Sequence, residues 1–123
     1  MSIQLNSSIP VLRVSDYPRA RAFYETLGFR MIEEGGEPAQ FGIFRNGSAE
    51  VFLDGFHGAD PQREAGWRMY CHLADVDAAA EQLRAAGIQL KRGPESMVYG
   101  CREIDIADPD GNCICFGQIL DDA

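Results

Sequence analysis

The sequence predicts an α+β fold made of two tandem modules, each ordered strand, helix, strand, strand, strand, with a concave groove between them. Three observations predict it: a repeat with a shift of 59 residues, a helix signal early in each copy, and hairpin signals after it. Module 1 is expected at about 8–54, module 2 at about 67–120, and a Gly-, Pro- and charge-rich linker at 55–66. Together they form a single domain over residues 1–123.

Module 1 opens with alternating apolar residues at 9–14, which predict a strand. Asp16 can cap a helix over about 17–27, because its side chain can accept from the first free backbone N–H groups. Asn46-Gly47 is a strong hairpin signal between the last two strands. The three strand-like runs after the helix are residues 29–34, 39–45 and 49–54.

Module 2 repeats this order. The same shift aligns Asp16 with Asp75, and Gly28 with Gly87, and each glycine fits a left-handed helix end. The expected elements are a strand at 67–73, a helix through 78–86, and strands at 88–92, 98–106 and 112–120. One module alone has too little core, so two sheets are expected to pack together and line a shared groove, the natural ligand site.

Charge and composition narrow the function. The net charge of −8 argues against nucleic acid, which needs clustered Lys and Arg. Acidity is explained either by solubility or by attraction of a cationic ligand. The N-terminal residues show no basic and apolar signal segment, and no long apolar run predicts a membrane span. A cytoplasmic protein with reduced thiols at its four cysteines is therefore expected.

Three stretches carry a family resemblance: VSDYPRARAFYETLGF, LADVDAAAEQLRAAGI and IADPDGNCICF. Together they make the chain resemble the glyoxalase, bleomycin-resistance and extradiol-dioxygenase superfamily, also called vicinal oxygen chelate, from about residue 9 to residue 120. The resemblance implies the glyoxalase/bleomycin-resistance fold of paired βαβββ units, often dimeric. In the enzymes of that superfamily, His, Gln or Glu residues from the first and last strand of each module hold a divalent metal.

The positions implied by that ligand set are mostly unsuited to a metal here. Ile9 and Arg68 open the two modules, and neither an alkyl group nor a permanent cation donates a lone pair. In the closing strands Glu50 matches the first carboxylate, and Cys115 stands at the second. We therefore expect no metal, no cofactor and no catalytic residue, and an ion pair between Glu50 and Arg68. A soft-metal site from Cys113, Cys115 and His72 stays open as an alternative.

Within the superfamily, the chain resembles the metal-free bleomycin-resistance proteins in four stretches: IPVL, QFGIFRNGSAEVFL, YGCREIDI and DPDGNCICF. The resemblance implies an acidic homodimer that sequesters its drug without changing it. Strand alternation places Arg68, Tyr70 and His72 on one face, with Glu50 and Phe52 on the matching face of module 1. The full set of expected ligand-binding residues is Phe41, Glu50, Phe52, Trp67, Arg68, Tyr70, His72, Tyr99 and Cys115.

Three functions follow from these residues. The leading hypothesis is a metal-independent protein that binds a bleomycin-like drug or another aromatic compound in the groove. The second is a metal-dependent glyoxalase- or dioxygenase-type enzyme with an atypical ligand set around Glu50, His72 and Cys115. The third is a small-molecule carrier or sensor that uses the same groove.

Overall fold

The structure is a computed structural model, and it describes residues 1–121. Its elements in chain order are β1 (Val11–Arg13), α1 (Tyr17–Thr26), β2 (Arg30–Gly35), β3 (Phe41–Asn46), β4 (Ala49–Asp54), β5 (Trp67–His72), α2 (Val76–Ala85), β6 (Arg92–Ser96), β7 (Cys101–Ala107) and β8 (Cys113–Ile119).

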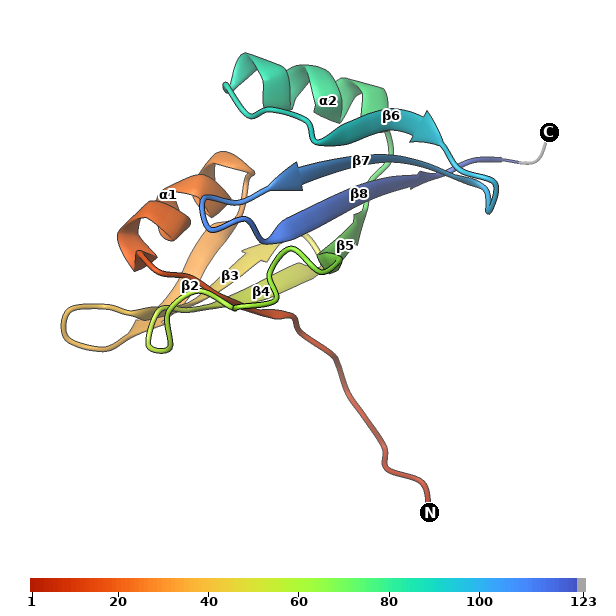
Figure 1. Cartoon of the computed structure of the whole chain (residues 1–123). Helices are drawn as coiled ribbons and strands as arrows, with labels where there is room; N and C mark the ends of the chain where they lie inside the picture. The colour runs from red at the N-terminus through yellow and green to blue at the C-terminus, as the bar shows by residue number, and fades with distance from the viewer. Residues whose placement is uncertain (122–123) are drawn as a thin grey trace.

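The strands form two four-stranded sheets with the same topology. Their orders are β1-β4-β3-β2 and β5-β8-β7-β6, and in each the first strand pairs parallel to the last. Helix α1 contacts β3 and β4, whereas α2 contacts β6, β7 and β8. In Figure 1, α2 covers β6–β8 from above, and β2–β4 lie below. The predicted α+β fold of two βαβββ modules is confirmed.

The helix ends follow the predicted signals. The carboxylates of Asp16 and Asp75 each accept a hydrogen bond from the backbone N–H three residues later, at 3.1 and 3.0 Å. After the helices, Gly28 and Gly87 take φ values of +97° and +79°, a region that glycine enters without a Cβ clash. The two modules therefore begin and end their helices with the same residue types at equivalent positions.

One predicted strand is wrong. Residues 88–92 were expected to form it, but β6 begins only at Arg92. Ile88 and Leu90 instead pack against the core from a loop, and the Lys91 N–H donates to the Asp105 carbonyl at 2.7 Å, where pairing with β7 starts. Their alternation reflects loop packing, which periodicity alone does not separate from a strand.

Alternation sorts the strand residues between two faces. Six inward side chains of β3, β4, β7 and β8 are fully buried beneath the helices: Phe44, Val51, Leu53, Ile104, Ile106 and Ile114. We call the opposite face of each sheet, turned away from its helix, the outer face.

The turn at residues 108–112 fastens the two modules together. The buried Tyr24 hydroxyl of α1 donates to Asp108 at 2.9 Å, and the Asn112 amide donates to the Arg13 carbonyl at 3.0 Å. Buried hydrogen bonds of this kind fix the position of the β7–β8 hairpin against module 1.

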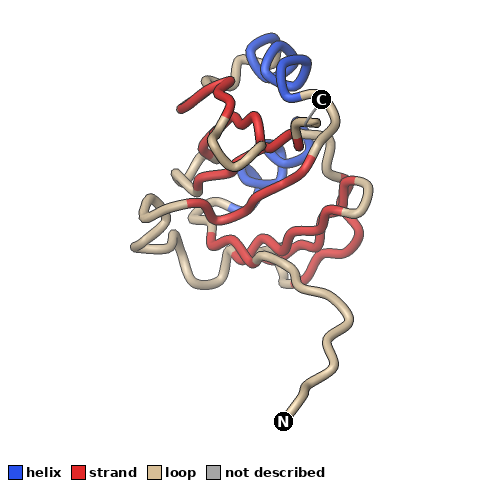
Figure 2. Tube along the Cα trace, turned by 90° about the vertical axis from the view of Figure 1, so that its right-hand side faces the viewer, coloured by secondary structure: helices blue, strands red, loops and turns tan. Residues whose placement is uncertain are grey.

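The N-terminal residues 1–8 are exposed and lead away from both sheets (Figures 1 and 2). Among residues 1–121 no helix has the length and apolar character needed to cross a membrane.

Candidate functional site

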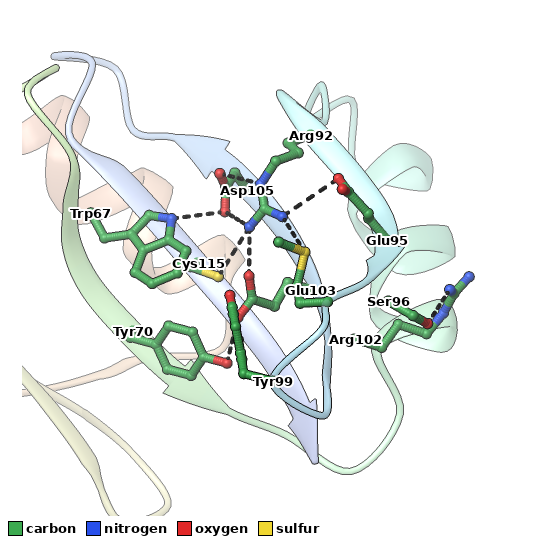
Figure 3. Close-up of polar contacts among 11 residues, drawn as sticks. Trp67, Tyr70, Arg92, Glu95, Ser96, Tyr99, Arg102, Glu103, Asp105 and Cys115 are labelled. Atoms are coloured by element: carbon green, nitrogen blue, oxygen red, sulfur yellow. Dashed lines mark hydrogen bonds and ion pairs between the residues drawn. The ribbon is translucent and has the colours of Figure 1, made fainter. Parts of the chain in front are cut away.

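The outer face of module 2 is strongly polar. On β7, Ile104 and Ile106 point into the core, so Glu103 and Asp105 point to the outer face. Both carboxylates are nevertheless buried, because other side chains cover them (Figure 3). Buried carboxylates require hydrogen-bonding partners, and their partners define the site.

Glu103 has no exposed surface and accepts three hydrogen bonds. The donors are the hydroxyls of Tyr70 at 2.9 Å and Tyr99 at 2.7 Å, and the Arg92 guanidinium at 2.7 Å. Burial by itself raises the pKa of Glu103, but the bonds from Tyr99, Arg92 and Tyr70 outweigh it and lower that pKa below its ordinary value. The hydrogen bond that Tyr99 donates to Glu103 raises the pKa of Tyr99 to about 12. Glu103 is therefore ionised and Tyr99 is protonated at neutral pH.

Arg92 links Glu103 to Asp105. Its Nε and Nη2 atoms donate to the two oxygens of Asp105 at 2.8 and 3.0 Å, a bidentate contact. The Trp67 indole N–H also donates to Asp105, at 3.2 Å. Burial raises the pKa of Asp105, yet the bonds from Arg92, Cys115 and Trp67 lower it overall. We call the seven residues of this network the Arg92 cluster: Trp67, Tyr70, Arg92, Tyr99, Glu103, Asp105 and Cys115.

Aromatic rings line β5 beside these carboxylates. Trp67, Tyr70 and His72 form a row with 5.2 Å between successive ring centroids. An irregularity in the pairing with β8 between Trp67 and Met69 brings Trp67 onto the same face as Tyr70. Trp67 and Tyr99 remain 47% and 56% exposed, so part of each residue is accessible to a ligand.

Cys115 is fully buried on β8, with Sγ 3.8 Å from Nη2 of Arg92. Burial, followed by its contact with Asp105, raises the pKa of the Cys115 thiol well above its ordinary value. A protonated buried thiol is a poor nucleophile and a poor metal ligand. Cys113 lies on the same strand face, and the described cysteines are free of disulfides.

The outer face of module 1 carries the remaining predicted residues. Phe41 and Phe52 are half-buried and meet edge to face, with 5.6 Å between centroids. Glu50 pairs with Arg45, directly opposite it in the β3–β4 ladder, at 3.6 Å. The expected ion pair between Glu50 and Arg68 is therefore wrong for the described residues.

The Arg68 guanidinium instead donates to the Gln62 carbonyl in the linker. It still lines a cavity of about 540 Å³ between the modules, where residues 8–10, the beginning of β4 and β5 meet. This inter-module cavity brings four predicted residues together: Glu50, Arg68, Tyr70 and His72. Its volume is within the range of small-molecule sites. Tyr70 belongs both to this cavity and to the Arg92 cluster, because its hydroxyl donates to Glu103.

Strand registers correct one expected equivalence. Cys115 pairs with Tyr70, and the residue that pairs with Val11, one repeat earlier, is Phe52. Glu50, which the sequence matched to Cys115, lies two residues before that position. The structural counterpart of Cys115 in module 1 is thus an aromatic ring.

A divalent metal does not fit the positions that the family implies. They hold an alkyl group, an aromatic ring, a guanidinium and a protonated thiol, at Ile9, Phe52, Arg68 and Cys115. Hard cations require several oxygen or nitrogen donors. Across residues 1–121 no three His, Cys, Asp or Glu side chains gather so as to hold a metal, including the set of Cys113, Cys115 and His72.

Sequence reasoning missed Arg92, Glu103 and Asp105. The alternation of acidic and aliphatic residues in REIDI, residues 102–106, was a usable signal: a buried strand with two carboxylates on one face demands a cation nearby. Nothing in the sequence indicated that Arg92 lies opposite these carboxylates, because Arg92 begins β6 and the predicted strand ended there.

Comparisons with known proteins agree with the fold. Residues 8–116 match the model of the glyoxalase/bleomycin resistance protein/dioxygenase superfamily. A bleomycin-binding protein solved with bleomycin is 26% identical with a TM-score of 0.71, over 93% of this chain and 98% of that one. An antibiotic-binding protein from Streptomyces sp. CB03234 is 27% identical, with a TM-score of 0.75 and coverages of 95% and 99%.

A lactoylglutathione lyase from Agrobacterium tumefaciens shares the fold, at 21% identity and a TM-score of 0.73, over 95% of this chain and 96% of that one. Among curated proteins, none matches the sequence.

Proposed function

The chain belongs to the glyoxalase/bleomycin resistance protein/dioxygenase superfamily, and we propose that it is a metal-independent binding protein that sequesters a cationic aromatic antibiotic such as bleomycin. The observation that carries the proposal is the Arg92 cluster. Beside Cys115, one of the four positions from which metal-dependent relatives are expected to bind their metal, this chain has a guanidinium bonded to two carboxylates.

The charge and the rings of the site suit such a ligand. Glu103 and Asp105 are ionised, and Arg92 neutralises only one of the two charges. The exposed parts of Trp67 and Tyr99 offer aromatic surface next to that negative charge. A flat, positively charged molecule gains from both, through ring stacking and through cation–π attraction.

The proposed binding residues lie on both outer faces and in the inter-module cavity. Those expected from the sequence are Phe41, Glu50, Phe52, Trp67, Arg68, Tyr70, His72, Tyr99 and Cys115, to which the structure adds Arg92, Glu103 and Asp105. We further propose that two copies associate, as the resemblance to a superfamily of often dimeric proteins implies. Sedimentation velocity tests this with a dimer as the expected species.

Calorimetric titration of chelator-dialysed protein with bleomycin tests the proposed function. Saturable binding at micromolar protein is expected, and Glu103→Gln is expected to weaken it about tenfold by removing a charge next to the ligand. Glu81→Gln is the matched control, because Glu81 is exposed on α2 and pairs with Arg84 at 3.2 Å, away from the outer face. Absence of heat and of saturation for the unmodified protein would overturn the assignment.

A further inference from the structure

The Arg92 guanidinium is enclosed on several sides. It bonds to Asp105 and Glu103 at 2.7 to 3.0 Å, and it lies 5.9 Å from the centroid of the Trp67 ring. Sulfur atoms complete the contacts, with Met97 Sδ at 3.2 Å and Cys115 Sγ at 3.8 Å (Figure 3). The three nitrogens all have partners.

This arrangement has the form of a receptor for a guanidinium. A carboxylate that accepts two parallel N–H bonds, a second carboxylate at the side and an indole face are the groups that recognise this planar cation. Trp67 comes from β5, and Glu103 and Asp105 come from β7. The occupant comes from β6, so receptor and occupant belong to different strands.

The receptor is held in place independently of Arg92. Glu103 is fixed by the hydroxyls of Tyr70 and Tyr99, and Asp105 by the indole N–H of Trp67. Both carboxylates are buried, and a buried charge without a counter-ion is strongly unfavourable. The site therefore requires a cation, but its geometry does not require that the cation be Arg92.

Arg92 has a route out of this site. It lies on the edge strand of its sheet, and the β6–β7 pairing is interrupted between Arg92 and Glu95. Its side chain is 26% exposed, and the exposed Glu95 carboxylate lies 3.6 Å from Nη1 on the solvent side. Rotation of the Arg92 side chain toward solvent would break none of the bonds that Tyr70, Tyr99 and Trp67 donate to the two carboxylates.

We propose that Trp67, Glu103 and Asp105 form a subsite for guanidinium-type cations, which Arg92 closes in the free protein and which a ligand's guanidinium or amidinium group enters by exchange with Arg92. The proposal rests on the proposed function and names the ligand class of the same site. Because the subsite is open only while Arg92 is displaced, the apparent affinity equals the intrinsic affinity reduced by the open fraction. Arg92 thereby sets the selectivity of the site.

Trp67 is the single tryptophan of the sequence, so its fluorescence reports the exchange directly. The probe is n-butylguanidinium, and n-butylammonium serves as a probe of equal charge without the planar fork. Arg92→Ala is expected to bind n-butylguanidinium at least about tenfold more tightly than the unmodified chain, because the competitor is gone. Arg102→Ala is the matched control, since Arg102 pairs with Asp77 at 2.9 Å away from the subsite, and it should leave binding unchanged.

The proposal fails if Arg92→Ala binds n-butylguanidinium no more tightly than the unmodified chain, or if it binds both probes equally. Should Arg92→Ala not fold, Arg92→Lys provides the test. A lysine keeps the positive charge but cannot donate two parallel N–H bonds to Asp105, so it should compete less well with n-butylguanidinium. Binding of n-butylguanidinium a few-fold tighter than in the unmodified chain is expected, and unchanged binding overturns the proposal. These assays contain no antibiotic. A negative bleomycin titration therefore does not contradict the guanidinium subsite, and a negative n-butylguanidinium titration does not contradict binding of bleomycin.

Discussion

At matched positions of the two sheets, module 1 carries Phe41 and Phe52 where module 2 carries Glu103 and Cys115. Beside these positions the buried inward residues are apolar in both modules, among them Val51, Leu53, Ile104 and Ile114. The fold is therefore maintained by the inward half of each strand, and the outward half is free to differ. One module presents rings and the other presents an ion-pair network on the same backbone plan.

The largest expected difference is in stability. Arg92→Met leaves Glu103 and Asp105 buried without their cation, so the free energy of unfolding should fall by about 3 to 5 kcal/mol. Arg45→Met, which removes the more exposed ion pair with Glu50, should cost about 1 kcal/mol or less. Urea unfolding of both variants measures the contrast, and equal losses would refute the difference between the modules.

Removal of a ring from module 1 should have an intermediate effect. Phe52→Ala loses half-buried apolar area and the edge-to-face contact with Phe41, which amounts to about 1.5 to 2.5 kcal/mol. Its counterpart Cys115→Ala deletes only a sulfur atom, and about 1 kcal/mol is expected. Thermal unfolding ranks the two variants, and a larger loss for Cys115→Ala would show that the thiol contributes more to the Arg92 cluster than its contacts indicate.

The smallest effect concerns pH. The pKa of Glu103 in the folded protein lies below its ordinary value of 4.5, so its stabilisation is complete above about that pH and is lost as the pH falls through the folded pKa. Glu103→Gln should therefore lose less free energy of unfolding than the unmodified chain as the pH falls from 6 to 3. Urea midpoints across that range give the slopes, and parallel slopes would contradict the ionised, hydrogen-bonded state of Glu103.

Most of the fold could be predicted from the sequence, because its signals are local. The Asp16 and Asp75 caps and the Asn46-Gly47 turn each involve residues a few positions apart. The Arg92 cluster could not, because Arg92 meets Glu103 only across a strand pairing that starts later than the periodicity indicates.

Among the predicted site residues, the aromatic ones were the easier to place. Tyr70 and Phe52 follow from alternation, and both lie on outer faces. The predicted ion pair of Arg68 with Glu50 is wrong because the Arg68 guanidinium donates to the Gln62 carbonyl of the linker, a contact that strand alternation does not reveal. Glu50 was misjudged because its nearest cation, Arg45, lies directly across the hairpin.

The central claim is that the resident cation of this site is a side chain and not a metal. Elemental analysis of protein purified without chelator tests it most directly. The account predicts no stoichiometric zinc, nickel, manganese or iron, since Arg92 already bonds to both carboxylates and the positions that the family implies do not suit a hard cation. One tightly held metal ion per chain, lost together with ligand binding on dialysis against chelator, would contradict it.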